Sequence, residues 1–375
     1  MQYVAIIGTG FVADLYMSSL KSFPGIALRA ATDKNPDRLA AFASYWDAQT
    51  VADIPALLSL CSKDDLVLNL TDPRNHYAVS HEVLAAGHHV YSEKPLAMTV
   101  DEARALTNQA QQNNLHLSSA PCSFLSETAQ TLAAAVRTKS AGDMLLAYAE
   151  LDDGFISQAP YQHWVSASGA PWPADDEFEV GCTLEHAGYY LTWLMMIFGP
   201  VKRVVAEAAE LDTDKPAGGA PDYATGVLTF ESGFVARLTC SIIARHDHGL
   251  RLFGTEGTLE VRESWNNLAP VRKRTRRRIR RRLVEWPLTK RLRLKAPSHA
   301  KAESTKSAAM NFMLGPAEIL AAIYEGRESR MPTDFALHMT EVTLAIQSAG
   351  FGQGVAEIGS RFAPIAPMPW AEVLA

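Results

Sequence analysis

The sequence has few cysteines, and none of them are paired. Four occur in 375 residues, far apart and without a Cys-x-x-Cys motif: Cys61, Cys122, Cys182 and Cys240. This spacing favours reduced, mostly buried thiols over a disulfide framework or a zinc site. We therefore do not expect cysteine chemistry to carry the function.

Long apolar segments and a leader peptide are also missing. No uninterrupted apolar run reaches the ~18 residues that a membrane-spanning helix needs. The N-terminus, MQYVAIIGTGFVA, lacks the basic region and cleavage site of a signal peptide. It is typical of a strand that enters the fold directly, so we expect a cytoplasmic protein.

Basic residues are scarce outside one segment. Arg272–Lys295, called the basic segment below, holds 13 of the 35 lysine and arginine residues and a single acid, Glu285. The rest of the chain has 22 basic and 40 acidic residues, a net charge of −18. The segment fits a solvated hairpin or loop whose charge pairs with the acidic body, or a contact with a phosphate-bearing substrate or an anionic membrane surface. Nucleic acid is not expected. Apolar residues inside the segment permit an amphipathic arrangement: Ile279, Leu283, Val284, Trp286 and Leu288.

The length predicts two domains. In the first ~120 residues short β-branched runs alternate with helical patterns, which predicts βαβ units and an α/β Rossmann domain with a doubly wound parallel sheet. Its expected strands are 3–7, 26–32, 66–70, 89–91 and 115–118, and its expected helices are 11–20, one from 36, 75–86 and 100–112.

After Pro121 the pattern changes to longer strands and fewer helices. We expect helices at 127–137 and 184–198 and strands at 143–151, 201–208, 223–230, 234–243 and 250–253. Links such as Glu231-Ser232-Gly233 are of hairpin length, which predicts a largely antiparallel sheet. We therefore expect a nucleotide-binding domain at 1–121. An α+β substrate-binding and oligomerisation domain should follow at 122–375, with a basic insertion at 271–295.

A glycine-rich turn follows the first expected strand. Residues Gly8 to Ala13 form a G-x-G-x-x-A element between a strand and a helix, in which the glycines allow a tight turn and close approach to a pyrophosphate. The helix N-terminus then holds the diphosphate. An ordinary βα turn is the alternative. The expected cofactor contacts here are Gly8, Thr9, Gly10, Phe11 and Val12.

Asp33 strengthens the dinucleotide interpretation. It lies 23 residues after Gly10, at the end of the second strand, where a carboxylate accepts the hydroxyls of the adenosine ribose. Because Asp33 repels a 2′-phosphate, we expect NAD. Lys34 and Arg38 lie near enough to leave NADP open, although solvated charges at a helix start are the simpler interpretation of both.

A second motif, Glu93-Lys94-Pro95, ends the strand that begins at His89. The carboxyl edge of such a sheet is where cofactor and substrate meet. A lysine there can hydrogen-bond the nicotinamide ribose and the reacting hydroxyl, and desolvation can lower its pKa. A surface lysine before a turn-forming proline is the alternative.

Together these motifs and the antiparallel second domain resemble the glucose–fructose oxidoreductase/inositol dehydrogenase (Gfo/Idh/MocA) family over nearly the whole chain. Residues 71–76, Thr-Asp-Pro-Arg-Asn-His, resemble the family's loop that contacts the cofactor near the nicotinamide. The resemblance therefore implies cofactor contacts from Thr71, Asp72, Pro73 and His76, in addition to Glu93, Lys94 and Pro95.

The family's third signature is altered in this sequence. Where the family usually has Asp-x-Gly-x-His, residues 185–189 read Glu-His-Ala-Gly-Tyr. The resemblance implies that Tyr189 is the catalytic acid/base, as in relatives with tyrosine there, and a nearby Lys94 can lower a phenol's pKa. Substrate binding and plain packing are the alternatives for Tyr189. Glu185 shares the helix face of Tyr189 and is expected to orient the substrate or Lys94. His186 is the rival acid/base or a substrate contact, and a packed histidine is its simpler interpretation.

An aromatic and acidic loop, residues 161–177, is a candidate for sugar binding. Sugars stack on aromatic rings while carboxylates accept their hydroxyls, so Trp164, Trp172 and Glu177 are expected substrate contacts. Packing of the two tryptophans is the alternative. Arg245, His246 and His248 follow a strand without a carboxylate at ligand spacing, so we predict no metal.

We therefore expect an NAD(P)-dependent oxidoreductase that transfers a hydride between the nicotinamide and a hydroxyl-bearing carbon of a sugar, sugar derivative or polyol. The family resemblance also implies a homodimer or homotetramer. Two alternatives remain open at this stage. One is redox-neutral glycoside cleavage or elimination with tightly bound NAD, and the other is a non-catalytic dinucleotide-binding regulator.

Overall fold

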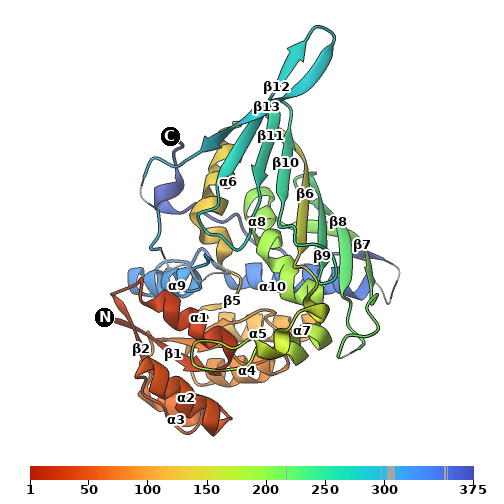
Figure 1. The fold of residues 1–375 in the computed structure, drawn as a ribbon. Coiled ribbons are helices and arrows are strands. Elements are labelled where there is room, and N and C mark those ends of the chain that lie inside the picture. The colour runs from red at the N-terminus through yellow and green to blue at the C-terminus, as the bar shows by residue number, and fades with distance from the viewer. Residues whose placement is uncertain (217, 297, 302–308, 350–351, 353) are drawn as a thin grey trace.

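A computed structural model describes residues 1–216, 218–296, 298–301, 309–349, 352 and 354–375. In space, the described residues form two sheets at opposite ends of the molecule, with a layer of helices between them (Figure 1). The N-terminal third of the chain makes the first sheet, and residues from 144 onward make the second.

The first sheet is parallel. Its strands lie in the order β2-β1-β3-β4-β5, and β1 pairs with both β2 and β3. Because the strand order reverses between β1 and β3, their carboxyl ends flank the crevice in which doubly wound sheets bind ligands. The predicted Rossmann sheet is confirmed. Its strands are β1 (Gln2–Ile7), β2 (Ile26–Thr32), β3 (Leu66–Asn69), β4 (His89–Ser92) and β5 (Leu117–Ser119).

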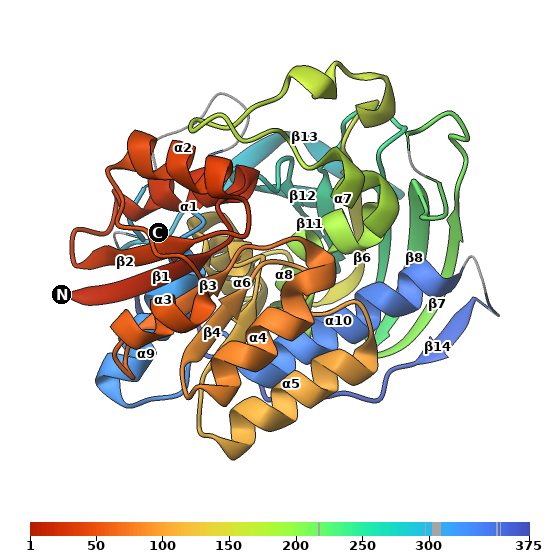
Figure 2. The same ribbon diagram turned by 90° about the horizontal axis from the view of Figure 1, so that it is seen from below.

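Helices cover both faces of this sheet, and two of them come from the far end of the chain (Figure 2). Ile6 of β1 belongs to a buried cluster with α1 and with Ile319 of α9, whereas Ile7 belongs to a cluster with α4, α5 and Leu337 of α10. The helices are α1 (Phe11–Leu20), α2 (Pro36–Trp46), α3 (Ile54–Leu60), α4 (His76–Ala85), α5 (Val100–Gln112), α9 (Leu314–Glu325) and α10 (Thr333–Ser348). None of the helices in the described residues is long and apolar enough to cross a membrane.

The second sheet is largely antiparallel, as predicted. Its strands lie in the order β13-β12-β11-β10-β6-β9-β8-β7-β14, and only β6 and β9 pair in parallel. Helices α6 (Glu127–Arg137), α8 (Gly188–Phe198) and α10 pack on one face (Figure 1). On β7, buried Val204 alternates with exposed Val205, so the other face is open. The strands are β6 (Met144–Asp152), β7 (Val201–Ala209), β8 (Tyr223–Phe230), β9 (Val235–Ser241), β10 (Leu250–Gly254), β11 (Gly257–Val261), β12 (Val271–Ile279), β13 (Arg282–Leu292) and β14 (Val355–Glu357).

The basic segment forms a hairpin at the edge of the second sheet. Strands β12 and β13 pair antiparallel as far as Ile279 and Arg282, with Arg280 and Arg281 at the turn. Figure 1 shows this hairpin projecting beyond the sheet, at the end of the molecule opposite the first sheet. Of the two forms considered from the sequence, the hairpin is therefore the correct one.

Candidate active site

The glycine turn after β1 presents open backbone to the crevice. Gly8 has a φ of 93°, and a Cβ there would lie 2.7 Å from the carbonyl carbon and oxygen of Leu70, so only glycine fits. A Cβ at Gly10 would meet no atom of the described chain within 4 Å. Helix α1 begins at Phe11 without a side-chain cap from the described residues. Its first N–H groups therefore suit a diphosphate, and the turn fits a dinucleotide.

A large cavity opens in front of this turn. Its volume of about 1610 Å³ exceeds the roughly 300–1,000 Å³ of a usual small-molecule pocket, so it has room for a dinucleotide and a second ligand. Two of the predicted site residues, Thr9 and Pro95, do not line it. The others do: Gly8, Gly10, Phe11, Val12, Asp33, Lys34, Arg38, Thr71, Asp72, Pro73, His76, Glu93, Lys94, Trp164, Trp172, Glu177, Glu185, His186 and Tyr189.

The carboxylate of Asp33 is fixed at the cavity wall by protein donors. Thr9 donates to it from its backbone N and from Oγ1, at 2.7 and 3.0 Å. Arg38 donates from Nε and Nη2, at 2.9 and 2.7 Å. Burial raises the pKa of Asp33, but the hydrogen bonds from Arg38, Asn35 and Thr9 lower it more, so the pKa lies below its ordinary value. Asp33 is therefore ionised, and Thr9 acts on the site through it.

The two basic neighbours of Asp33 differ. Arg38 is half-buried in its ion pair with Asp33, so the interpretation as a solvated charge is wrong for it. Lys34 is 77% exposed, with Nζ 3.6 Å from a carboxylate oxygen of Asp72, which fits that interpretation. The positive charge nearest Asp33 is thus already paired.

His76 connects the loops that follow β3 and β4. A 3₁₀ turn over Pro73–Asn75 comes first, so α4 begins at His76. The ring Nδ1 lies 2.6 Å from the Pro95 carbonyl oxygen and Nε2 lies 2.9 Å from that of Thr71. Burial lowers the pKa of His76. The neutral ring has a single N–H and donates to only one of these two carbonyl oxygens at a time, and in either tautomer it lies between the loops of Thr71 and Pro95.

Glu93 anchors the end of β4 beneath the cavity. Tyr16 of α1 donates a hydrogen bond of 2.6 Å to Oε1 of Glu93, and the Lys94 backbone N donates one of 3.1 Å to Oε2. Tyr16 and Glu93 are both buried. The backbone at Lys94 is thereby held to the first helix of the domain.

Lys94 and Glu185 form an ion pair between the two domains. Lys94 follows β4, and Glu185 lies on a π-helical turn, Thr183–Ala187, that precedes α8. Their side chains are only 19% and 10% exposed. Burial by itself lowers the pKa of Lys94, but the charge of Glu185, the charge of Glu93 and the hydrogen bond to Glu185 raise it more. The expectation that desolvation lowers this pKa is therefore wrong, because the lysine has a buried carboxylate partner.

Tyr189 lines the cavity one turn beyond Glu185. Because of the π-helical turn, α8 begins at Gly188 rather than at the predicted residue 184. The ring meets that of Trp265 edge to face, with centroids 6.2 Å apart. Burial raises the pKa of Tyr189 more than Lys94 lowers it. The expected lowering is therefore wrong in sign, and the phenol keeps its proton at neutral pH.

His186 and Glu177 are already bound to each other within the protein. Nε2 of His186 lies 2.7 Å from Oε1 of Glu177, and Nδ1 pairs with the carboxylate of Asp153. Burial lowers the pKa of His186, but the charges of Asp153 and Glu177 raise it well above its ordinary value. The two residues predicted as direct substrate contacts thus belong to a buried ion cluster at the cavity wall.

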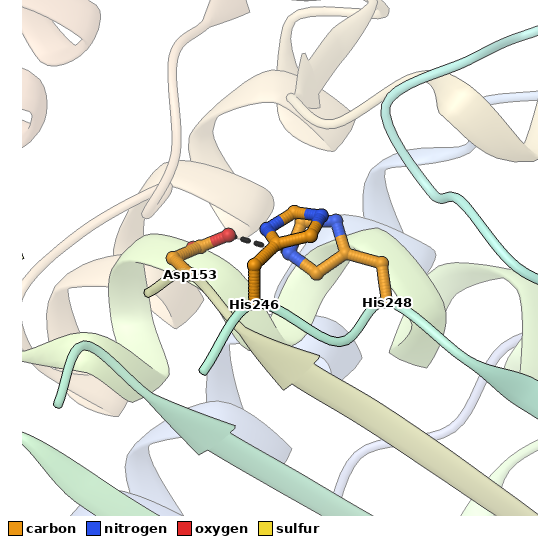
Figure 3. A group of neighbouring side chains, drawn as sticks. All are labelled: Asp153, His246 and His248. Atoms are coloured by element: carbon orange, nitrogen blue, oxygen red, sulfur yellow. Dashed lines mark hydrogen bonds and ion pairs between the residues drawn. The ribbon is translucent and has the colours of Figure 1, made fainter. Parts of the chain in front are cut away.

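Asp153 extends this cluster to two further histidines (Figure 3). Its carboxylate accepts from Nε2 of His248, whose Nδ1 lies 3.0 Å from Glu263, and ligand atoms of Asp153, His246 and His248 lie within 4.8 Å of one another. Contrary to the expectation from the sequence, a carboxylate does accompany these histidines, because Asp153 follows the end of β6 beside them. Burial lowers the pKa of His248, but hydrogen bonds to Asp153 and Glu263 raise it to about 9. A metal ion bound here would have to displace the proton of His248, because only the neutral imidazole is a ligand.

The aromatic loop between β6 and α7 (Ala174–Val180) crosses the cavity to the first domain. The Trp172 ring packs 5.2 Å from that of Trp164 and 6.1 Å from that of Phe178, so packing describes Trp172. Trp164 is 37% exposed and lines the cavity. The backbone N of Ser168 donates a 2.7 Å hydrogen bond to Asp14 of α1. The loop is therefore attached to both domains.

Asp176 is a site residue that the sequence analysis missed. It lines the cavity from α7, one residue before Glu177. Burial and then the charges of Glu185 and Asp72 raise its pKa to about 6. The sequence drew attention to the neighbouring Glu177, which also lines the cavity but is bound to His186.

Comparison with known proteins identifies the family. Residues 3–120 match the model described as "Oxidoreductase family, NAD-binding Rossmann fold", and residues 129–260 match that of the GFO/IDH/MocA C-terminal domain. The chain belongs to the Gfo/Idh/MocA family of oxidoreductases. The predicted family, fold class and NAD cofactor are therefore confirmed.

Several relatives in this Gfo/Idh/MocA family are sugar dehydrogenases. D-glucoside 3-dehydrogenase of Escherichia coli is 36% identical over 108 residues, which cover 28% of this chain and 31% of that protein. D-apiose dehydrogenase of Paraburkholderia graminis is 24% identical over 265 residues, 68% of this chain and 66% of that protein. Among solved structures, the WlbA dehydrogenase of Bordetella pertussis in complex with NADH and UDP-GlcNAcA has a TM-score of 0.70 at 16% identity, with 96% and 99% of the two chains covered.

Proposed function

We propose that this protein is an NAD-dependent dehydrogenase that acts on a hydroxyl-bearing carbon of a sugar, a sugar derivative or a polyol. The observation that carries the proposal is the convergence of three groups on one cavity. The glycine turn at Gly8 and Gly10 comes from β1, Lys94 comes from β4, and Tyr189 comes from the second domain. Cofactor-binding backbone and proton-carrying side chains therefore line the same space.

The residues that would hold NAD lie along the carboxyl edge of the first sheet. The N–H groups of the first turn of α1 suit the diphosphate, and Asp33 suits the adenosine ribose. Thr71 and Lys94 line the cavity farther along that edge. Bound NAD supplies the carbon that accepts or donates the hydride.

Lys94 and Tyr189 supply two donors for one substrate oxygen. The ammonium of Lys94 stays charged beside Glu185, and the Tyr189 phenol stays protonated because it is buried. Two donors stabilise negative charge on a carbonyl or alkoxide oxygen. When a ketone is reduced, the Tyr189 O–H bond breaks as the substrate O–H bond forms, and solvent reprotonates the tyrosinate. In oxidation the steps run in reverse: Tyr189 first loses its proton to solvent, and the tyrosinate then accepts the proton of the substrate hydroxyl as that O–H bond breaks.

The remaining walls suit a polyhydroxylated substrate. Asp176 places a carboxylate beside the Lys94–Glu185 pair, and Trp164 offers a partly exposed ring. A carboxylate accepts from hydroxyl groups, and an aromatic ring stacks on apolar C–H faces. The sugar dehydrogenases among the relatives support the same substrate class.

The environment of Asp33 favours NAD over NADP. A 2′-phosphate at the adenosine ribose would meet an ionised carboxylate whose basic neighbour, Arg38, is already paired with it. The negative charges of the phosphate and of the Asp33 carboxylate would repel each other. We therefore expect NAD to bind more tightly than NADP.

The test is a substrate screen with the purified full chain. Thermal-shift titration with NAD⁺, NADH, NADP⁺ and NADPH comes first, and the larger stabilisation is expected from the NAD pair. Sugars, nucleotide sugars and polyols are then added with the preferred cofactor while nicotinamide absorbance is followed. Sugar-dependent NADH formation supports the proposal. Product formation without any change in absorbance would contradict it in favour of a redox-neutral cycle. Stabilisation by none of the four cofactors would contradict it altogether.

A further inference from the structure

The β12–β13 hairpin takes no part in the site described above. It projects at the end of the molecule opposite the first sheet (Figure 1). Its turn and distal strands carry six arginines in a run of seven residues, Arg276–Arg282. Such a concentration of one charge at a protruding tip calls for a partner of opposite sign.

The acidic body of the protein does not neutralise this tip. Within the described residues, the arginines of β12 that pair with carboxylates are Arg274 and Arg276, and both precede the turn. Arg274 pairs with Glu260 at 3.1 Å, and Arg276 lies 3.7 Å from Glu285. No ion pair in the described part of the chain includes Arg277, Arg278 or the turn arginines. The charge at the tip is therefore directed to solvent.

Large apolar side chains are exposed among these arginines. Ile279, Leu283 and Leu288 are 51%, 65% and 71% exposed. In the hairpin register Ile279 faces Arg282 and Leu283 faces Arg278, so each apolar side chain has an arginine beside it on its own face of the ribbon. Both faces of the tip therefore combine an aliphatic group with a cation.

We propose that this tip binds the surface of an anionic phospholipid bilayer. Arginine guanidinium groups would pair with lipid phosphates, and the aliphatic side chains would enter the boundary between headgroups and acyl chains. The β12–β13 ladder pairs the inward-facing backbone groups of the two strands, and the outward-facing groups would stay at the hydrated headgroup level, because the tip would lie in the interface and not cross the bilayer. The net charge of −18 outside the segment repels the same surface. The molecule would thus be held by the tip with its other end pointing away.

Two other anionic partners fit the tip less well. Single-stranded nucleic acid is bound by stacking bases on open aromatic rings, and the one aromatic residue of the hairpin, Trp286, has its ring covered by Arg277 at 4.4 Å. An acidic patch on a second copy would attract the arginines, but it offers no apolar environment to Ile279 and Leu283. Exposed aliphatic groups at the extreme tip favour lipid.

Co-sedimentation of the full chain with vesicles tests the proposal. Phosphatidylcholine vesicles are compared with vesicles that also contain phosphatidylglycerol, at low and high salt. Binding is expected only to the anionic vesicles and should weaken as salt is added. Replacing the turn arginines together, Arg280→Ser, Arg281→Ser and Arg282→Ser, should weaken partition about fivefold per charge removed. The matched replacement of the same three residues by lysine should keep most of the binding.

A second variant separates lipid insertion from simple charge attraction. Ile279→Ser with Leu283→Ser keeps every arginine, so it should reduce vesicle binding while heparin binding stays unchanged. Both positions lie outside the buried core, so unfolding temperature and NAD binding are expected to match those of the parent chain.

Four results would overturn the proposal. These are equal binding to neutral and anionic vesicles, vesicle binding unchanged in the Ile279/Leu283 variant, tighter binding to a single-stranded oligonucleotide than to vesicles at the same salt, or a smaller molar mass by light scattering when the turn arginines are removed. The last would assign the tip to a second copy. None of these measurements depends on the enzymatic activity.

Discussion

The carboxylate of Glu185 pairs with the ammonium of Lys94 although the two residues come from different domains. Each is carried by a turn rather than by a regular element, Lys94 by the turn after β4 and Glu185 by the π-helical turn before α8. Single π-helical turns are frequent at functional sites. The pair therefore sets the position of Tyr189 relative to the first sheet.

Replacing Lys94 tests its role at the substrate oxygen. Lys94→Met is expected to lower kcat/KM by about 10²–10⁴-fold, the usual contribution of a positioned proton donor. Glu185 would then be buried without a partner charge, which destabilises the fold. The double variant Lys94→Met/Glu185→Gln should restore the unfolding temperature but not the activity. Exposed Lys34 provides the control, and an equal loss in Lys34→Met would contradict the assignment.

The proton carried by Tyr189 is removed by Tyr189→Phe, which keeps the ring and its contact with Trp265. We expect kcat to fall about 10²–10⁴-fold while NADH binding, followed by fluorescence, stays the same. Tyr324, which is 84% exposed, provides the matched Tyr324→Phe control. Full activity in Tyr189→Phe would exclude the phenol as the proton carrier.

The ionised carboxylate of Asp176 is expected to destabilise the fold and to contribute to substrate binding. Its pKa is raised from 3.8 to about 6, so the folded protein binds the proton more tightly than the unfolded chain, and stability falls as pH rises between these values. Asp176→Asn is expected to stabilise the fold at pH 7 by about 1 kcal/mol after allowance for solvent screening, and to raise the KM for the substrate. Thermal unfolding at acidic and neutral pH is the measurement. If Asp176→Asn stabilised the fold equally at about pH 4, the ionisation of Asp176 would not be the cause of the gain.

His248 predicts a loss of stability in alkaline solution. Its pKa is raised from 6.5 to about 9, so its stabilising contribution is complete below the lower value and disappears as pH rises through the upper one. Unfolding midpoints between these pH values should decline less steeply in His248→Gln than in the parent chain. If the unfolding midpoints of the two proteins declined equally steeply with pH, His248 would not be protonated in the folded protein. An activity that is lost on chelation and regained with Zn²⁺ would contradict its protonation as well.

The two glycines of the cofactor turn predict different failures. Gly10→Ala meets no atom of the described chain within 4 Å, so the unfolding temperature should hold while NAD binding weakens, because the added methyl occupies space needed by the diphosphate. Gly8→Ala places a Cβ 2.7 Å from backbone atoms of Leu70 and should destabilise the fold itself. Calorimetric titration and thermal unfolding distinguish the two. Equal loss of stability in both variants would contradict the separate roles of Gly8 in the fold and Gly10 in cofactor binding.

Local patterns in the sequence were enough to predict the first sheet and its turns. The helix 100–112 and the strand 223–230 were predicted with their observed bounds, because Thr99 caps the former and apolar residues alternate along the latter. The glycine turn and the lysine after β4 could also be identified, because each belongs to a short motif that is contiguous in the chain.

Long-range pairing was what the sequence could not reveal. The pKa directions for Lys94 and Tyr189 depend on burial and on Glu185, and the charge state of His248 depends on Asp153, 95 residues earlier in the chain. Helices α3, α7, α9 and α10 were not predicted. The last of these packs against both sheets, so it lacks the single apolar stripe that marks a surface helix.

Helices α9 and α10 complete the first domain late in synthesis on the ribosome. All five strands of the first sheet and the cofactor turn have been made by residue 119, whereas α9 ends at Glu325 and α10 at Ser348. Until then, apolar residues of β3 and α5 that these helices cover remain uncovered. The third of the chain that is translated first therefore obtains its full helical cover only after Ser348 has been made.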